Sequence, residues 1–205
     1  MNCRCCGQIL PPPFLDLGEA PASNAYLETL PAPGTEARYP LRLRVCHSCW
    51  LVQTEDYTHP ATLFSADYAY FSSASSSWLE HCRDYCQTMR RELSLDERSL
   101  VVEIACNDGY LLKNFVQAGI PCLGIEPTAA TAAAARRLGI PVREEFFGAR
   151  SARRLLGEGI EADLVLGNNV YAHVPDLADF TSGLALILKK RGTLTLEFPH
   201  LLRLL

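Results

Sequence analysis

The feature that most constrains the fold is an alternation of short apolar runs with helical segments, which begins near Ser99 and continues almost to the C-terminus. Several of the helical segments stop at a glycine, a residue that ends helices easily. Strands that are apolar on both faces belong in a parallel sheet covered on both sides by helices. The sequence therefore predicts an open α/β fold, with strands at 99–105, 121–126, 140–144, 162–168 and 192–198 and helices at 110–119, 128–139, 148–159 and 175–192.

Residues 1–60 have a different texture, because proline and turn residues dominate and five of the nine cysteines lie there. Such a segment has too little apolar content for a core of its own and would be stabilised by a cross-link or a metal. Residues 61–97 hold an aromatic loop and an amphipathic helix, with serines at 75–77 as N-cap candidates. We expect a small N-terminal domain at 1–60, a connecting loop and helix at 61–97, and the sheet domain at 98–205.

Two pairs of cysteines predict a metal site in the N-terminal domain. Cys3 and Cys6 form one C-x-x-C pair, and Cys46 and Cys49 form another. A two-residue gap lets both thiolates face one ion, and two such pairs complete the tetrahedral four-cysteine site of structural zinc. The interval between the pairs is long for a zinc site, so free thiols in a loop-rich domain remain the alternative. Cys5 and His47 could also be ligands, although both lie inside a pair where the geometry is unfavourable.

The other cysteines suggest no chemistry. Cys82 and Cys86 lie four residues apart on the expected connecting helix, so they face the same way and are interpreted as small core residues. Cys106 and Cys122 lie in or beside expected strands. Free thiols and metal ligands are typical of a reducing compartment. With no apolar run of membrane length and no signal-peptide layout at the start, the sequence indicates a cytoplasmic protein without a membrane partner.

The net charge of −4 disfavours a nucleic-acid partner, since such proteins usually present a basic face. A small-molecule ligand is expected instead, beyond the carboxyl ends of the strands where open α/β folds bind their ligands. The turn "EIACNDGYLL" after the first strand occupies that place. A dinucleotide site would need glycines where Ala105, Asn107 and Tyr110 stand, so nicotinamide cofactors are disfavoured.

Two acids at neighbouring strand ends point to another ligand. Glu103 lies at the end of the first strand, and Glu126 closes the second, where a carboxylate can accept both ribose hydroxyls. Carboxylates without a phosphate-binding turn suit S-adenosylmethionine, which carries a ribose and a positive sulfonium but no phosphate. The alternative is that Glu126 is an ordinary acid at a strand end. At the end of the fourth strand, "GNNVYAHVPDL" places His173 at the same crevice, either touching substrate or as a surface histidine.

Together these residues resemble one family, the S-adenosylmethionine-dependent C-methyltransferases of nucleotide-linked deoxy-ketosugars in antibiotic pathways. The resemblance extends over nearly the whole chain and is carried by "CRCCG", "LDLGEAPASNAYL", "YPLRLRVCHSCWLVQ", "DYAYFSSASSSWLEH", "VVEIACNDGYLL", "GIEP", "NNVYAHVPD" and "GTLTLEFPHL". It implies a Rossmann-like class I methyltransferase sheet preceded by a small zinc-binding domain. A C-terminal domain would follow.

The resemblance also implies roles for particular residues. The zinc ligands would be the four cysteines of the two pairs. Tyr68, with Tyr70 as second choice, would lie near the sugar, and His173 would lie at the substrate face. The cofactor would be bound by Glu103, Asn107, Gly109, Glu126 and Asn169, with Phe147 against the adenine. Family members usually have glycine at the positions of Ala105 and Trp50, and the second difference raises a question about the packing of the zinc-binding pair.

The expected reaction begins with proton loss from a carbon beside a ketone, after which the enolate takes the methyl group in line. In the family, the best candidate for the principal base lies in a histidine-glutamate-histidine segment beyond the fifth strand, whereas this chain stops at Leu205. "LTLEF" would also be an exposed apolar sheet edge. We therefore expect a truncated, monomeric chain that retains the zinc and cofactor parts and binds a nucleotide-sugar partner. The alternative is a non-catalytic zinc-bearing binding module or adapter.

Overall fold

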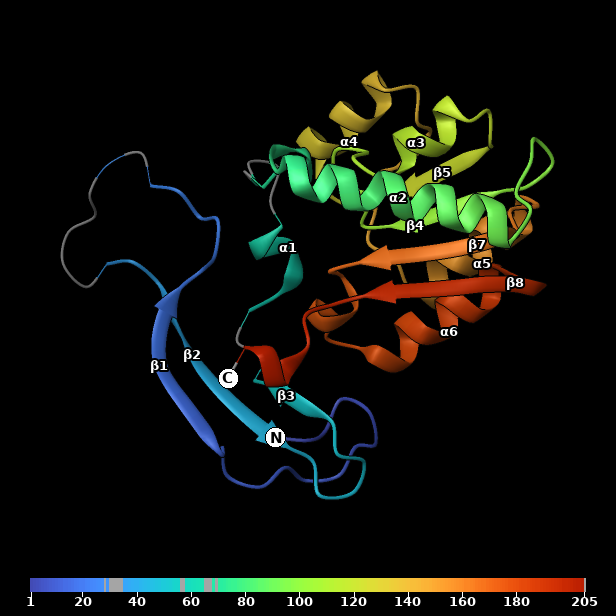
Figure 1. The fold of residues 1–205 in the computed structure, drawn as a ribbon. Coiled ribbons are helices and arrows are strands. Elements are labelled where there is room, and N and C mark those ends of the chain that lie inside the picture. Colours follow the sequence, from blue (N-terminus) through green and yellow to red (C-terminus); the bar gives the residue numbers. More distant parts are fainter. Residues whose placement is uncertain (28, 30–34, 56–57, 65–67, 69, 205) are drawn as a thin grey trace. The chain divides into compact units, whose positions relative to one another are not determined.

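The computed structural model describes residues 1–27, 29, 35–55, 58–64, 68 and 70–204 (Figure 1). The chain divides into two compact units. Residues 1–70 with 175–178 form unit 1, and residues 71–174 with 179–205 form unit 2. No helix in the described part of the chain is long and apolar enough to cross a membrane.

Unit 1 is a small antiparallel sheet with very little core. Its three strands pair in the order β1-β2-β3, and a single helical turn, α1, follows them. Among the described residues of this unit, the buried apolar ones are Cys3, Leu10 and Cys46, against which Cys49 and Leu51 pack. The cysteine pairs thus supply most of what this unit buries. Its elements are β1 (Leu15–Pro21), β2 (Arg38–Val45), β3 (Val52–Thr54) and α1 (Pro60–Leu63).

Unit 2 contains the parallel sheet that the sequence predicts. Its five strands pair in the order β6-β5-β4-β7-β8, so the first strand of the sheet is central and the switch point lies between β4 and β7. This is the doubly wound, Rossmann-like arrangement, and it confirms the expected open α/β fold. The strands are β4 (Val101–Ile104), β5 (Cys122–Ile125), β6 (Val142–Arg143), β7 (Ala162–Asn168) and β8 (Leu188–Glu197).

Helices cover both faces of this sheet (Figure 1). Val101 and Leu164 belong to one core cluster, together with buried residues of α2 and α3, whereas Val102 and Val165 pack on the other face against α5 and α6. Because side chains alternate along a strand, each strand supplies both layers. The helices are α2 (Ser76–Glu92), α3 (Leu112–Gln117), α4 (Ala129–Arg137), α5 (Ala149–Gly157) and α6 (Leu177–Ile187).

Helix ends agree with the sequence signals in most places. Ser75 caps α2, since its hydroxyl accepts the N–H of Trp78, and Cys82 and Cys86 of this helix are buried in the core as expected. Gly119, with φ +72°, ends α3 in a Schellman motif in which the next residue, an isoleucine, donates to the Phe115 carbonyl. Gly139 and Gly159 end α4 and α5 in the same way.

The prediction of a helix over 175–192 is wrong at its C-terminal end. Helix α6 stops at Ile187 and β8 begins at Leu188, which pairs with Ala162 before the register shifts. Gly192 lies at this irregularity, where an added Cβ would come within 2.8 Å of the Ala162 carbonyl oxygen. The stretch "LKKRG" is compatible with both a helical and a strand pattern of apolar residues. It forms a strand because it pairs with β7.

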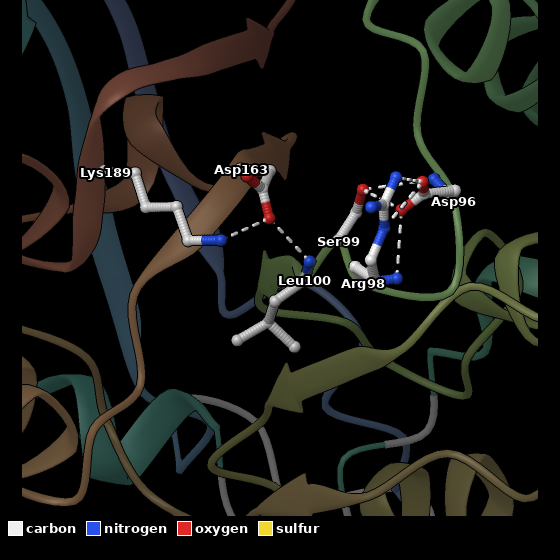
Figure 2. A network of polar contacts seen from close by, with 6 residues as sticks. All are labelled: Asp96, Arg98, Ser99, Leu100, Asp163 and Lys189. Carbon is white, nitrogen blue, oxygen red and sulfur yellow. Dashed lines mark hydrogen bonds and ion pairs between the residues drawn. The ribbon is translucent and has the colours of Figure 1, made fainter.

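A polar network fixes the amino ends of β4, β7 and β8 (Figure 2). One carboxylate oxygen of Asp163 accepts the backbone N–H of Leu100 at 2.8 Å and the ammonium group of Lys189 at 2.7 Å. In the loop before β4, Asp96 binds Arg98 and Ser99. These contacts join three neighbouring strands at one edge of the sheet.

Candidate functional site

The four predicted zinc ligands come together in unit 1. The sulfur atoms of Cys3, Cys6, Cys46 and Cys49 all lie within 4.8 Å of one another. The Cys3 and Cys49 sulfurs are 3.6 Å apart, and those of Cys6 and Cys46 are 3.5 Å apart. Zinc bonds of about 2.3 Å in a tetrahedron place sulfurs about 3.8 Å apart. The donor set and its spacing therefore fit a closed, structural zinc site.

The two cysteine pairs are built alike. The residue after each pair donates its backbone N–H to the carbonyl of the first cysteine, from Gly7 to Cys3 and from Trp50 to Cys46, each at 2.9 Å. Both of these residues have positive φ, +74° for Gly7 and +63° for Trp50. This turn explains why glycine suits both positions, and Trp50 adopts it with an exposed side chain.

Hydrogen bonds prepare two of the thiols for metal binding. Although burial opposes ionisation, the backbone N–H groups of Cys6 and Cys5 and the amide of Gln53 lower the pKa of Cys3 to about 6. The backbone of Cys49 and Ser48 similarly lowers the pKa of Cys46. Thiolates rather than thiols bind zinc, so these contacts favour the ligand form.

In unit 2, the turn after β4 brings together three of the predicted cofactor residues. Asn107 and Gly109 have φ of +49° and +78°, and Ala105 before them has +58°. The N–H of Asn107 donates to Glu126 at 2.9 Å, and its side-chain oxygen accepts the N–H of Ser72. A Cβ on Gly109 would lie 2.4 Å from an Ile140 methyl group, so this glycine also permits close packing of the turn.

Glu126 follows β5 and is almost fully buried. Its two carboxylate oxygens accept the N–H groups of Asn107 and Thr128, at 2.9 and 3.0 Å. The side chain therefore fixes the turns after two neighbouring strands. Each oxygen still has a second acceptor position, so a ribose hydroxyl could bind without displacing either amide.

Glu103, on β4, has no exposed surface, and neither carboxylate oxygen has a hydrogen-bond partner. Desolvation raises its pKa well above the ordinary range, and repulsion from Glu126 and Asp108 adds to this. Burial therefore favours the protonated form of this carboxyl group.

Two further polar residues of this edge were missed by sequence reasoning. Asp108 is buried, and while one of its oxygens accepts the N–H of Ser73, the other has no partner. Thr128 is also buried, with an unpartnered hydroxyl. The sequence signal for Asp108 was its place beside Asn107 in the turn after the first strand of the parallel sheet. No sequence signal pointed to Thr128. Buried polar atoms without partners are rare, so a cluster of them indicates a ligand site.

The other predicted cofactor residues lie at the same edge but have structural contacts. Asn169, just after β7, is exposed with φ +53°, and its N–H donates to the Glu197 carbonyl at 2.7 Å. Phe147, between β6 and α5, packs edge-on against Phe180 at 5.4 Å between ring centroids. The ring of Phe147 thus supports α6, and its contact with adenine remains a prediction.

The two predicted substrate residues are in different units. Tyr68 belongs to unit 1 and packs edge-on against Phe64, with ring centroids 5.2 Å apart. His173 is exposed, in a short 3-10 helix (Tyr171–His173) of unit 2. Their roles remain predictions.

Comparison with known proteins identifies relatives of the whole chain. A family described as a candidate zinc-binding domain matches residues 3–64. The C-methyltransferase NovU of Streptomyces niveus is 30% identical over 204 residues, which is 100% of this chain and 48% of that protein. The chain thus spans about half the length of the curated relative that it matches.

Solved structures are similar to part of the chain. An S-adenosylmethionine-dependent methyltransferase from Anabaena variabilis is 20% identical, with a TM-score of 0.47, over 56% of this chain and 50% of that one. DesVI of Streptomyces venezuelae is 17% identical, with a TM-score of 0.48, over 60% of this chain and 52% of that one.

Proposed function

We propose that this chain, which is 30% identical over its whole length to a C-methyltransferase, provides the zinc-binding and donor-binding parts of an S-adenosylmethionine-dependent enzyme that methylates a carbon atom of a nucleotide-linked, dTDP-type deoxy-ketosugar in antibiotic biosynthesis. The sugar class rests on the sequence resemblance. The free thiols fit a reducing compartment, so the cytoplasm is the proposed location. We also retain the three-part division of the chain at 1–60, 61–97 and 98–205 as a proposal.

The observation that carries this proposal is the set of buried, unpartnered oxygens on Glu103, Asp108 and Thr128 at the carboxyl edge of the sheet. Together with Glu126, they make a site with three carboxyl groups and no nearby phosphate-binding turn. Such a site favours a ligand that is cationic and rich in hydroxyl and amine donors. S-adenosylmethionine has this chemistry, and the oxygens of the site would gain the partners that they lack.

In this mechanism the protein residues bind, orient and shield. Glu126 would accept the ribose hydroxyls, the Asn107 turn would hold the nucleoside, and Glu103 and Asp108 would face the cationic end of the donor. When bound, the donor supplies an electrophilic methyl group. Tyr68 and His173 are the proposed sugar contacts, and the four-cysteine site holds the fold of unit 1 without entering the reaction.

Isothermal titration of the zinc-loaded chain with S-adenosylmethionine and S-adenosylhomocysteine tests the proposal. We expect both to bind, and Glu126→Gln to weaken both by about tenfold or more, since a charged hydrogen bond contributes about 1.5–3 kcal/mol. Glu144→Gln is the matched control, because Glu144 is exposed and binds Arg136 instead. Absence of binding to the parent chain would reject the donor site and leave the zinc-bearing adapter as the function.

A further inference from the structure

The turn after β4 is covered in this structure. Residues 106–112 are all buried, and the oxygen of Asp108 that has no hydrogen-bond partner is also shielded from solvent. The unpartnered hydroxyl of Thr128 is equally inaccessible. A ligand that approaches the carboxyl edge of the sheet can therefore reach these oxygens only after part of the protein has moved.

The segment that lies on this turn is residues 71–75 of unit 2, named the strap from here on. Its middle is the short 3-10 helix η1 (Ser72–Ala74), and its last residue, Ser75, caps α2. Ser72 is buried, whereas the other four residues of the strap are exposed. The strap is thus a single layer of chain between the turn and solvent.

Two hydrogen bonds hold the strap on the turn. The N–H of Ser72 donates to the side-chain oxygen of Asn107 at 2.9 Å, and the N–H of Ser73 donates to the Asp108 carboxylate at 3.2 Å. Both acceptors belong to the proposed donor site. Because one such bond changes an equilibrium by only about two- to tenfold, the strap can open locally while the sheet stays folded.

Building on the proposed function, we propose that the strap is a gate over the donor site, which opens to admit S-adenosylmethionine and closes again on the bound donor. In the closed state one oxygen of Asp108 accepts from the strap and the other has no partner. The ammonium group of the donor has the chemistry to supply that missing partner. Closure over the donor would also keep water away from its methyl group, as enzyme lids commonly do.

Proline at position 72 tests the gate without changing any donor-binding side chain. Ser72 is the first residue of η1, and Phe71 before it is extended, with φ −111° and ψ 117°. Proline suits the first position of a helical turn after an extended residue, and it lacks the N–H that Asn107 accepts. Ser72→Ala is the matched control, because it keeps this N–H and loses only the hydroxyl.

Stopped-flow tryptophan fluorescence of the zinc-loaded chain with S-adenosylhomocysteine measures the rates. Trp78 is a reporter of the strap, because its N–H donates to Ser75. Ser72→Pro weakens the closed state with and without ligand. We therefore expect its association and dissociation rate constants both to rise by about threefold or more, while the dissociation constant stays within about twofold of the parent value. Ser72→Ala should match the parent. Unchanged rates in Ser72→Pro, or weaker binding without faster association, would overturn the gate.

Hydrogen exchange of the parent chain provides a test that does not depend on folding of the proline variant. Bound S-adenosylhomocysteine should slow exchange of the Ser72 and Ser73 amides by about tenfold or more, because the ligand favours the closed strap. The N–H of Leu100, which donates to Asp163 at the opposite end of the sheet, is the control and should change little. If the ligand binds and exchange at 72 and 73 does not slow, the strap is not a gate. If calorimetry shows no binding to the parent, the donor site itself is rejected.

Discussion

Unit 1 contains five cysteines, four of which form a cluster, and unit 2 contains four cysteines in very different surroundings. In unit 1 the four sulfurs share one space, and hydrogen bonds lower the pKa of Cys3 and Cys46. In unit 2 the thiols of Cys82, Cys86, Cys106 and Cys122 are buried in one apolar core cluster. Burial raises the pKa of Cys82 to about 12 and that of Cys122 to about 11. Cysteine is therefore a metal ligand where amide groups surround the thiol. It is a small apolar core residue where hydrocarbon side chains surround it.

The comparison extends to how each unit is stabilised. Unit 1 buries only a few residues around its cysteines, whereas unit 2 packs two apolar clusters on the two faces of its sheet. A unit with so small a core needs a bound metal, while a doubly covered sheet does not. We therefore expect the metal to control one unit and leave the other unchanged.

Zinc removal should produce the largest effect. Structural zinc contributes about 10 kcal/mol or more to folding of small domains, so chelation should unfold β1–β3. Hydrogen exchange should then lose protection in unit 1 and retain it in β4, β5 and β7. In thiol labelling, the four clustered cysteines of unit 1 should become reactive while those of unit 2 remain protected. Equal loss of protection in both units would contradict the comparison.

The second test concerns Glu103, a buried carboxyl group of unit 2 whose two oxygens have no hydrogen-bond partner. Its folded-state pKa is raised, so its contribution to stability is intact below the unfolded pKa, near 4.3, and is lost as pH rises toward the folded pKa. Glu103→Gln removes this titration. Between the unfolded and the folded pKa, the free energy of unfolding of the variant should rise relative to that of the parent by about 1.4 kcal/mol per pH unit.

Urea unfolding from pH 4 to 8 measures this gain, with Glu144→Gln as the exposed control. A difference between Glu103→Gln and parent that does not change with pH would show that the carboxyl group is already ionised in the folded chain.

Gln53 tests how far the metal site depends on its supporting contacts. Its amide donates to the Cys3 sulfur at 3.2 Å and its side-chain oxygen accepts the N–H of Arg4, so one buried residue of β3 holds the first cysteine pair. Gln53→Leu should weaken zinc binding by about tenfold or more, as loss of such supporting contacts commonly does. Competition with a chromogenic chelator measures the affinity, and Gln8→Leu, at an exposed position, provides the comparison. Equal affinities would mean that the cysteine turns alone define the site.

The sequence predicted those features that depend on local pattern. The strands and helices of the sheet domain follow from alternating apolar runs, and the zinc ligands follow from two short spacings, because each signal lies within a few residues. Features that depend on contacts between distant segments of the chain were harder to predict from the sequence. The end of α6 is set by β7, and the unpartnered hydroxyl of Thr128 is defined only once Glu126 has folded against the turn.

Backbone conformation was the property that the sequence predicted least well. Two positions of unusual conformation are nevertheless those where this sequence departs from the family pattern. Ala105 and Trp50 stand where the family usually has glycine, and both adopt positive φ. An L-residue pays about 1–2 kcal/mol for that conformation, a cost that glycine largely avoids. The question raised by Trp50 therefore concerns the turn of the cysteine pair more than its packing, because the indole is 72% exposed.

The smallest expected effect compares the two cysteine pairs directly. Trp50→Gly should relieve the second turn and strengthen zinc binding by about fivefold, equivalent to about 1 kcal/mol. Gly7→Ala should weaken binding by a similar factor through φ alone, since an added Cβ at Gly7 would meet nothing within 4 Å. Chelator competition measures both variants. Stronger zinc binding by Trp50→Gly and similarly weaker binding by Gly7→Ala would show that the two turns are energetically equivalent. Weaker binding by Trp50→Gly would mean that the exposed indole itself supports the metal site.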